Sequence, residues 1–123
     1  TETVIWASKN QKSKHTFNYD LMKEINGGKQ MKDVWTMTAP SKGEKEHGKH
    51  PTQKPIDLLH RLIEAASNEG DMVLDAFNGS GTTGVACIET KRNYIGIELD
   101  REYIKLSKKR FKSKESEIKS RLF

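Results

Sequence analysis

The chain has 123 residues and a net charge of +5, with 22 Lys or Arg against 17 Asp or Glu. This length supports one hydrophobic core, and no apolar run approaches the roughly 20 residues that a membrane-spanning helix needs. The basic excess favours a polyanion partner, although a solvated protein surface can carry the same charge. The single cysteine, Cys87, cannot form an intramolecular disulfide, and no charged leader precedes an apolar stretch, so we expect a cytoplasmic protein and a thiol packed in the core.

The first predicted element is a strand. Residues 3–8 are β-branched and aromatic without clean alternation, which is typical of a strand covered on both faces, and residues 1–8 are therefore assigned to a core sheet. Residues 9–49 then become rich in Lys, Asn, Gly, Ser and His, with Gly27 and Pro40 among the breakers. This composition predicts a loop-rich insertion.

A helix and a buried strand are predicted next. Over residues 52–67 the apolar side chains recur at helical spacing, with Thr52 as the expected N-cap and Pro55 in the first turn. Residues 72–74 form a short apolar run that leads into Asp75, which indicates a parallel strand buried on both faces. A glycine-rich turn follows.

The remaining elements complete a βαβ unit. A helix is predicted over residues 83–90 and a second strand over residues 94–97, ending at Glu98. Asp100 is positioned to cap a last helix, which runs into a basic tail at residues 113–123. The expected fold class is α/β with a parallel sheet.

The glycine turn and one carboxylate form the clearest functional pattern. Residues 79–84 read G-S-G-T-T-G, which matches G-x-G-x-x-G between a strand and a helix, and Glu98 ends the next strand. Glycines let a backbone approach a ligand closely, and a carboxylate at the next strand end can accept hydrogen bonds from a ribose diol. A ribose-bearing cofactor is therefore predicted, while the missing Gly-Lys-Ser/Thr excludes a Walker-type site.

The residues alone leave the choice of cofactor open. The same arrangement serves NAD, whose pyrophosphate faces a helix N-terminus. Asp75, just ahead of the turn, would oppose a pyrophosphate but could face the ammonium of an amino-acid group. It could equally cap the turn through local backbone hydrogen bonds.

The segment from HPTQKP through DAFNGSGTTG to IGIELDREYI, about residues 48–112, closely resembles the C-terminal half of DNA amino-methyltransferases. The similar subgroup places its catalytic segment before its cofactor-binding segment, and TETVIWASKN resembles the strand preceding the family's target-recognition region. The resemblance implies a Rossmann-like doubly wound methyltransferase sheet, incomplete in this chain. It also implies S-adenosyl-L-methionine as the cofactor.

The resemblance assigns site residues by position. Residues 50–112 would form the S-adenosylmethionine-binding part and residues 9–49 the target-recognition insertion. Glu98 would accept the ribose hydroxyls, and Pro51 and Pro55 would fix the backbone of HPTQKP. The other residues expected to bind the cofactor are Thr52, Gln53, Lys54, Asp75, Phe77, Gly79, Ser80, Gly81 and Thr82.

The family's catalytic tetrapeptide, Asp/Asn/Ser-Pro-Pro-aromatic, is absent, because none of the three prolines adjoins another. No catalytic residue is therefore expected in this chain. The resemblance implies a missing N-terminal catalytic half, in the same gene product or a second chain, and an inactive chain on its own. Its substrate would be a flipped-out base in duplex DNA, with adenine N6 favoured over cytosine N4.

The insertion carries the expected DNA contacts. Lys9, Lys12, Lys14 and His15 could meet phosphates, although a polar surface loop would have the same composition. No metal site is expected, since Gly43 and Gly48 break any register between nearby His and Glu residues. The competing hypotheses are an NAD-dependent Rossmann enzyme fragment and a non-catalytic DNA-binding or cofactor-binding module. The oligomeric state stays open, a homodimer included.

Overall fold

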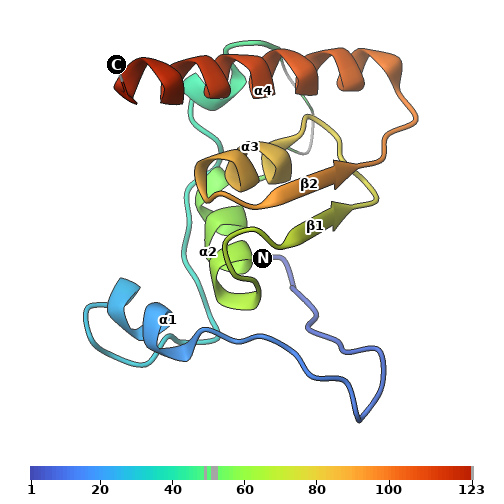
Figure 1. Ribbon diagram of the computed structural model, residues 1–123. Helices are drawn as coiled ribbons and strands as arrows, with labels where there is room; N and C mark the ends of the chain where they lie inside the picture. Colours follow the sequence, from blue (N-terminus) through green and yellow to red (C-terminus); the bar gives the residue numbers. More distant parts are fainter. Residues whose placement is uncertain (49, 51–52, 123) are drawn as a thin grey trace.

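The computed structural model describes residues 1–48, 50 and 53–122 and contains one α/β unit with extended additions (Figure 1). None of its described helices is both long enough and apolar enough to cross a membrane. The elements in chain order are α1 (Tyr19–Ile25), the 3-10 helix η1 (Gly43–Lys45), α2 (Ile56–Ala66), β1 (Met72–Asp75), α3 (Thr82–Glu89), β2 (Asn93–Gly96) and α4 (Arg101–Leu122).

The two strands pair in parallel, with Met72 opposite Asn93 at one end and Asp75 opposite Gly96 at the other. Helix α3 connects them, so β1, α3 and β2 form the βαβ unit that the sequence predicts. Because both strands run the same way, the residues that follow Asp75 and Gly96 emerge at one edge of the sheet. The glycine turn lies at that edge.

The core lies between the sheet and the helices α2 and α3. Ala86 and Cys87 are completely buried, and Ile63 of α2 packs against them. Val73 and Tyr94 contribute the inward faces of the strands. Burial raises the pKa of the Cys87 thiol to about 11, so the thiol stays protonated and acts as a small apolar core group, as expected.

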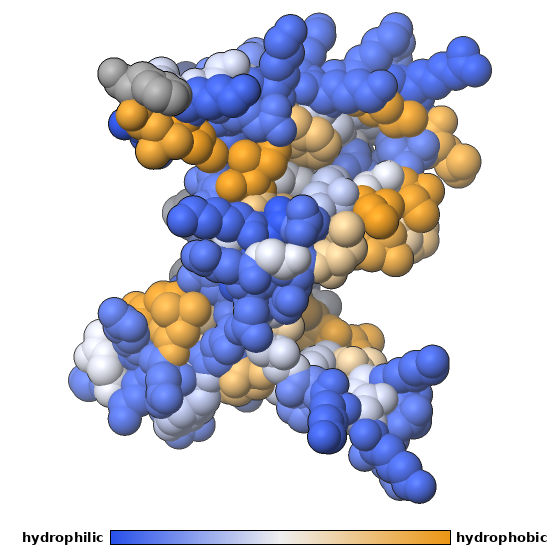
Figure 2. Space-filling view, in the orientation of Figure 1, coloured by the Kyte–Doolittle hydropathy of each residue, from blue (hydrophilic) through white to orange (hydrophobic). Residues whose placement is uncertain are grey.

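One face of the sheet is uncovered, which corrects the prediction of a strand buried on both sides. Met72 and Leu74 are 60% and 63% exposed, while Val73 between them is half-buried. The cause is that α2 and α3 pack on the inner face alone, and no described element covers the outer one. Hydrophobic surface is accordingly visible beside the strands in Figure 2.

The strand predicted over residues 3–8 is wrong in this structure. The segment is irregular, and Ile5 and Trp6 are 85% and 63% exposed. A strand needs a neighbour for its backbone N–H and C=O groups, and within the described residues β1 pairs only with β2. Trp6 packs instead against the rings of His15 and Phe17, at centroid distances of 5.1 and 5.4 Å.

Helix α4 lies across α3, and hydrophilic surface lines the upper edge of the molecule in Figure 2, where α4 lies in Figure 1. Asp100 caps it as predicted, because its Oδ1 accepts a hydrogen bond of 2.8 Å from the Glu102 N–H. The helix continues to Leu122. Of the residues expected as a basic tail, 113–123, the described ones, 113–122, are therefore a solvated helix end.

Groups from the insertion satisfy both ends of α2. At its N-terminus the Ile56 N–H donates to Glu44 Oε2 at 3.0 Å. At its C-terminus Asn18 Nδ2 donates to the carbonyls of Glu64 and Ser67, at 2.8 and 2.7 Å. The predicted N-cap, Thr52, lies outside the described residues, and Pro55 occupies the N-cap position of the helix as described.

A charged cluster joins α2, α3 and α4. His60 Nε2 lies 3.4 Å from Glu89 Oε2, and Lys114 Nζ lies 3.3 Å from Glu89 Oε1. The contact with Glu89 raises the pKa of His60 against the opposing effect of burial, and the same contact lowers the pKa of Glu89. The pair is therefore strongest when His60 is protonated and Glu89 ionised.

The His60 pair predicts a pH-dependent stability. Its contribution is fully present below the ordinary histidine pKa of about 6.5 and is lost as the pH rises through the higher folded-state pKa. His60→Gln should therefore lower the free energy of unfolding by about 1 kcal/mol or less near pH 6, and by less near pH 8. Urea unfolding at both pH values measures this, and an equal loss at both would exclude the ion pair as its cause.

Candidate functional site

The glycine turn connects β1 to α3 at the carboxyl edge of the sheet, where ligands of parallel α/β folds bind. Gly79 and Gly81 have φ values of 54° and 84°, in the left-handed region that favours glycine. A Cβ on Gly79 would lie 3.2 Å from His50 Nε2, and one on Gly81 would lie 2.8 Å from Ser107 Oγ. Neighbouring segments therefore approach this backbone from two sides.

Glu98 is anchored directly on this turn. Its Oε2 accepts a hydrogen bond from the Asp100 N–H at 2.9 Å, and its Oε1 accepts one from the Gly79 N–H at 2.8 Å. These backbone donors, that of Asp100 foremost, hold the pKa of Glu98 below its ordinary value. The carboxylate is thus ionised at neutral pH, and each oxygen keeps a lone pair for a further donor such as a sugar hydroxyl.

Asp75 adopts the local role that the sequence left open. Its Oδ1 accepts from the Phe77 N–H at 3.0 Å, and its Oδ2 accepts from the Thr83 hydroxyl at 2.7 Å. These bonds tie the end of β1 to the first turn of α3. The Phe77 side chain is 91% exposed beside them, at the position predicted to line a cofactor.

Two predicted cofactor residues turn their side chains into the fold. Ser80 and Thr82 are buried, and Arg110 of α4 donates from Nη1 to both hydroxyls at 3.0 Å. Their hydroxyls therefore have partners within the chain, and what this segment offers a ligand is its backbone. Arg110 was not among the predicted site residues, because in the sequence it is one of many basic residues of the last helix.

His50, the first residue of the HPTQKP segment, lies beside the glycine turn in space. The His50 ring lies against Gly79 and 4.3 Å from the ring of Tyr103. Gln53 is buried and donates from Nε2 to the Glu44 carbonyl at 2.9 Å. Lys54 forms an exposed ion pair with Glu2 at 2.7 Å.

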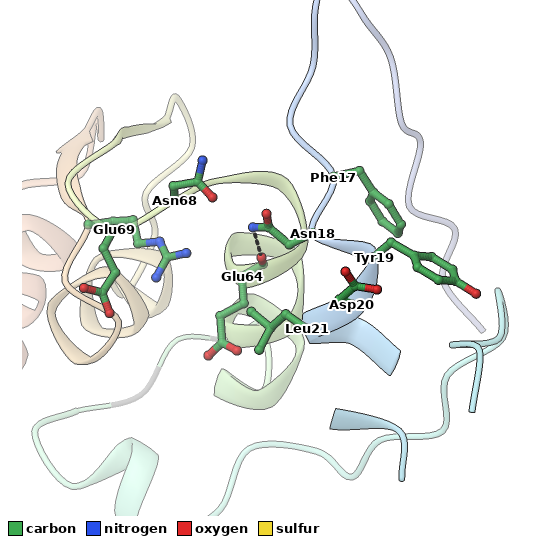
Figure 3. A pocket seen from close by; sticks show the side chains of 9 residues that line it. Phe17, Asn18, Tyr19, Asp20, Leu21, Glu64, Asn68 and Glu69 are labelled. Atoms are coloured by element: carbon green, nitrogen blue, oxygen red, sulfur yellow. Dashed lines mark hydrogen bonds between the residues drawn. The ribbon is translucent and has the colours of Figure 1, made fainter. Parts of the chain in front are cut away.

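Two pockets are candidate ligand sites. A groove of about 430 Å³ reaches Glu98 and is lined further by Ile97, Ile104 and Phe111. A larger open cavity of about 700 Å³ lies among Asn18, Glu64, Glu69, Arg92 and their neighbours (Figure 3). The larger cavity adjoins the amino ends of the strands. Ligands of parallel α/β sheets bind at the carboxyl ends, which favours the smaller groove beside the turn as the ligand site.

The residues predicted to meet DNA lie on the exposed loop that precedes α1. Lys9, Lys12, Lys14 and His15 are all exposed. The loop is a defined turn, because Asn10 Oδ1 accepts from the Lys12 N–H at 2.9 Å and the Asn10 N–H donates to Ser13 Oγ at 3.0 Å. The structure thus groups the three lysines on one projecting loop, remote from α4 (Figure 1).

Comparisons with known proteins identify the family of the chain. Residues 1–109 match the family model described as DNA methylase. The chain is 56% identical over 114 residues to the type II methyltransferase M2.DpnII of Streptococcus pneumoniae, which covers 92% of the chain and 42% of that relative. It is 45% identical over 116 residues to M.HinfI of Haemophilus influenzae, covering 90% of the chain and 32% of that relative.

Two solved structures with a similar fold are complexes with S-adenosylmethionine. The complex of M1.HpyAVI with S-adenosylmethionine is 41% identical, with a TM-score of 0.63 over 80% of this chain and 45% of that one. TTHA0409 of Thermus thermophilus, also complexed with S-adenosylmethionine, is 30% identical, with a TM-score of 0.51 over 68% of this chain and 30% of that one. The fold is thus Rossmann-like, and the chain spans less than half the length of the relatives it matches.

Proposed function

Because the chain belongs to the DNA methylase family, we propose that it is the S-adenosylmethionine-binding and DNA-recognition portion of a site-specific DNA methyltransferase. The observation that carries this proposal is the ionised Glu98 carboxylate, fixed on the backbone of a glycine turn at the ligand-binding edge of the sheet. A ribose diol offers two hydroxyl donors to such a carboxylate.

The residues at the turn fit this cofactor. Gly79 and Gly81 adopt the left-handed backbone conformation that shapes the turn, and Glu98 keeps acceptor capacity for the sugar. Thr52, Gln53 and Lys54 would hold the amino-acid end, together with the backbone of Ser80 and Thr82. When bound, S-adenosylmethionine supplies a methyl group activated by its sulfonium. The role of this chain is to orient that group.

The acceptor would be the exocyclic amine of a flipped-out base, adenine N6 in preference to cytosine N4. The chain carries no Pro-Pro-aromatic tetrapeptide to meet that amine, so a segment outside residues 1–123 would supply it. We therefore expect no methyl transfer to DNA from the 123-residue chain alone. Activity should appear when a family N-terminal half is joined to it, and labelled methyl transfer by the chain alone would refute this division.

Calorimetry tests the cofactor assignment without a need for turnover. S-adenosylhomocysteine, the demethylated product, should bind the chain with one site, and NAD should give no heat of binding under the same conditions. Binding of NAD alone would favour the dinucleotide hypothesis. Binding of neither ligand would reject the site as a nucleoside-cofactor site.

The projecting loop predicts a salt-dependent contribution to DNA binding. The double variant Lys12→Ala, Lys14→Ala should bind duplex DNA more weakly and lower the slope of log affinity against log salt by about two, since each phosphate contact contributes about 0.9. Fluorescence anisotropy over a salt series measures the slope, and Lys12→Arg, Lys14→Arg is the charge-matched control. An unchanged slope in the alanine variant would exclude these lysines from the interface.

A further inference from the structure

Arg110 is the most deeply buried basic side chain that the structure describes, at 7% exposure. A buried guanidinium usually faces a carboxylate, since burial of an uncompensated charge is costly. No ion pair of Arg110 occurs among the described residues, and Glu44 acts on it only at longer range. Arg110 donates instead to uncharged carbonyl and hydroxyl oxygens.

All the described hydrogen bonds of Arg110 end on the segment that leads from the glycine turn into α3. Nη1 donates to the Ser80 carbonyl, to Ser80 Oγ and to Thr82 Oγ1, each at 3.0 Å. One turn earlier on α4, Ser107 Oγ donates to the Gly79 carbonyl at 3.2 Å. Helix α4 thus holds the turn from its inner side.

Glu98 holds the same turn by accepting a hydrogen bond from the Gly79 N–H. Glu98 and Arg110 therefore contact different parts of the segment formed by residues 79–82. Glu98 holds its start, beside the expected sugar position, whereas Arg110 holds Ser80 and Thr82, where α3 begins. Negative charge is favoured at the start of a helix, and the carboxylate of the amino-acid end is the anionic group of S-adenosylhomocysteine.

From this arrangement we infer that Arg110 is a positioning residue of the cofactor site. It fixes the backbone at Ser80 and Thr82 and places a positive charge behind it, so that the amino-acid end of the cofactor binds to a preformed surface. The inference rests on the proposed function, because it assigns Arg110 a task within that same site. Arg110 itself does not touch the ligand.

Two ligands separate this role from general support of the fold. S-adenosylhomocysteine carries the amino-acid end, and 5′-methylthioadenosine lacks it while keeping the adenosine part. Arg110→Met keeps an unbranched stem without the guanidinium, and it should weaken S-adenosylhomocysteine about tenfold or more while changing 5′-methylthioadenosine less than about twofold. Arg110→Lys should fall between wild type and Met, because an ammonium keeps the charge without the planar fork.

Calorimetry with both ligands and thermal melting by circular dichroism give the result. Arg121→Met is the matched control, since Arg121 lies on the same helix, is exposed and pairs with Glu117; its affinities should equal those of the wild type. If Arg110→Met does not fold, Thr82→Val removes one acceptor from the other side and should show the same ligand selectivity. Equal loss for both ligands, or no loss, would overturn the inference. Failure of the wild type to bind S-adenosylhomocysteine would instead reject the proposed function.

Discussion

Glu98→Gln should weaken binding of S-adenosylhomocysteine by about 10- to 100-fold, because hydrogen bonds to a charged acceptor contribute about 1.5–3 kcal/mol each. The amide is close in size but neutral, and one of its two polar atoms can only donate. It therefore cannot accept from the Gly79 and Asp100 N–H groups and also from both hydroxyls of a ribose.

The measurement is isothermal calorimetry at pH 7, with Glu102→Gln as the matched control. Glu102 lies four residues away, in the first turn of α4, and contacts Lys105 rather than the glycine turn. Its variant should retain wild-type affinity. If Glu98→Gln bound the ligand as tightly as the wild type, Glu98 would have no part in holding the sugar.

Gly84→Ala should lower the free energy of unfolding by about 1–3 kcal/mol, the usual cost of overpacking a core. A Cβ at this position would overlap Phe111 Cζ and would lie 2.7 Å from Tyr94 Cε1. Alanine would otherwise favour the helix by about 1 kcal/mol over glycine, so the sign of the change decides whether the two rings can move. Phe111 and Tyr94 contact each other edge to face, which resists that movement.

Chemical denaturation gives the loss, and two further variants interpret it. Gly43→Ala is the control, because the nearest neighbour of its added Cβ would be Ser41 Oγ at 3.8 Å, an ordinary contact. Phe111→Leu added to Gly84→Ala should recover part of the stability by making room. A stabilised Gly84→Ala protein would show that helix propensity outweighs the packing of α3 against α4 and β2.

The βαβ unit was predictable because its signals are local. The apolar run before Asp75, the glycines at 79 and 81 and the Asp100 cap each act within a few residues of themselves. The same holds for Glu98, whose place at the end of a strand follows from the spacing. In this unit the local patterns and the tertiary fold agree, so the local patterns were sufficient to predict it.

The features that the sequence did not predict depend on contacts between residues that are distant in sequence. Residues 3–8 have strand composition, yet no described neighbour pairs with them, so propensity alone could not decide their structure. The caps of α2 come from Asn18 and Glu44, which are distant in sequence from the ends they satisfy. In the sequence, Arg110 is one of many basic residues in the last helix. Only the packing of α4 on the glycine turn shows that its side chain is buried.

If residues 9–49 recognise the target sequence, as proposed, their attachment to α2 would constrain how this chain could acquire a new specificity. Asn18 and Glu44 lie within residues 9–49, yet they complete the two ends of a helix outside that range. A recombination that imported a foreign loop without equivalents of this amide and this carboxylate would leave bare peptide groups at both ends of α2. Evolution of a new target sequence would therefore proceed by replacing the stretch between these two anchors, with the anchors themselves retained.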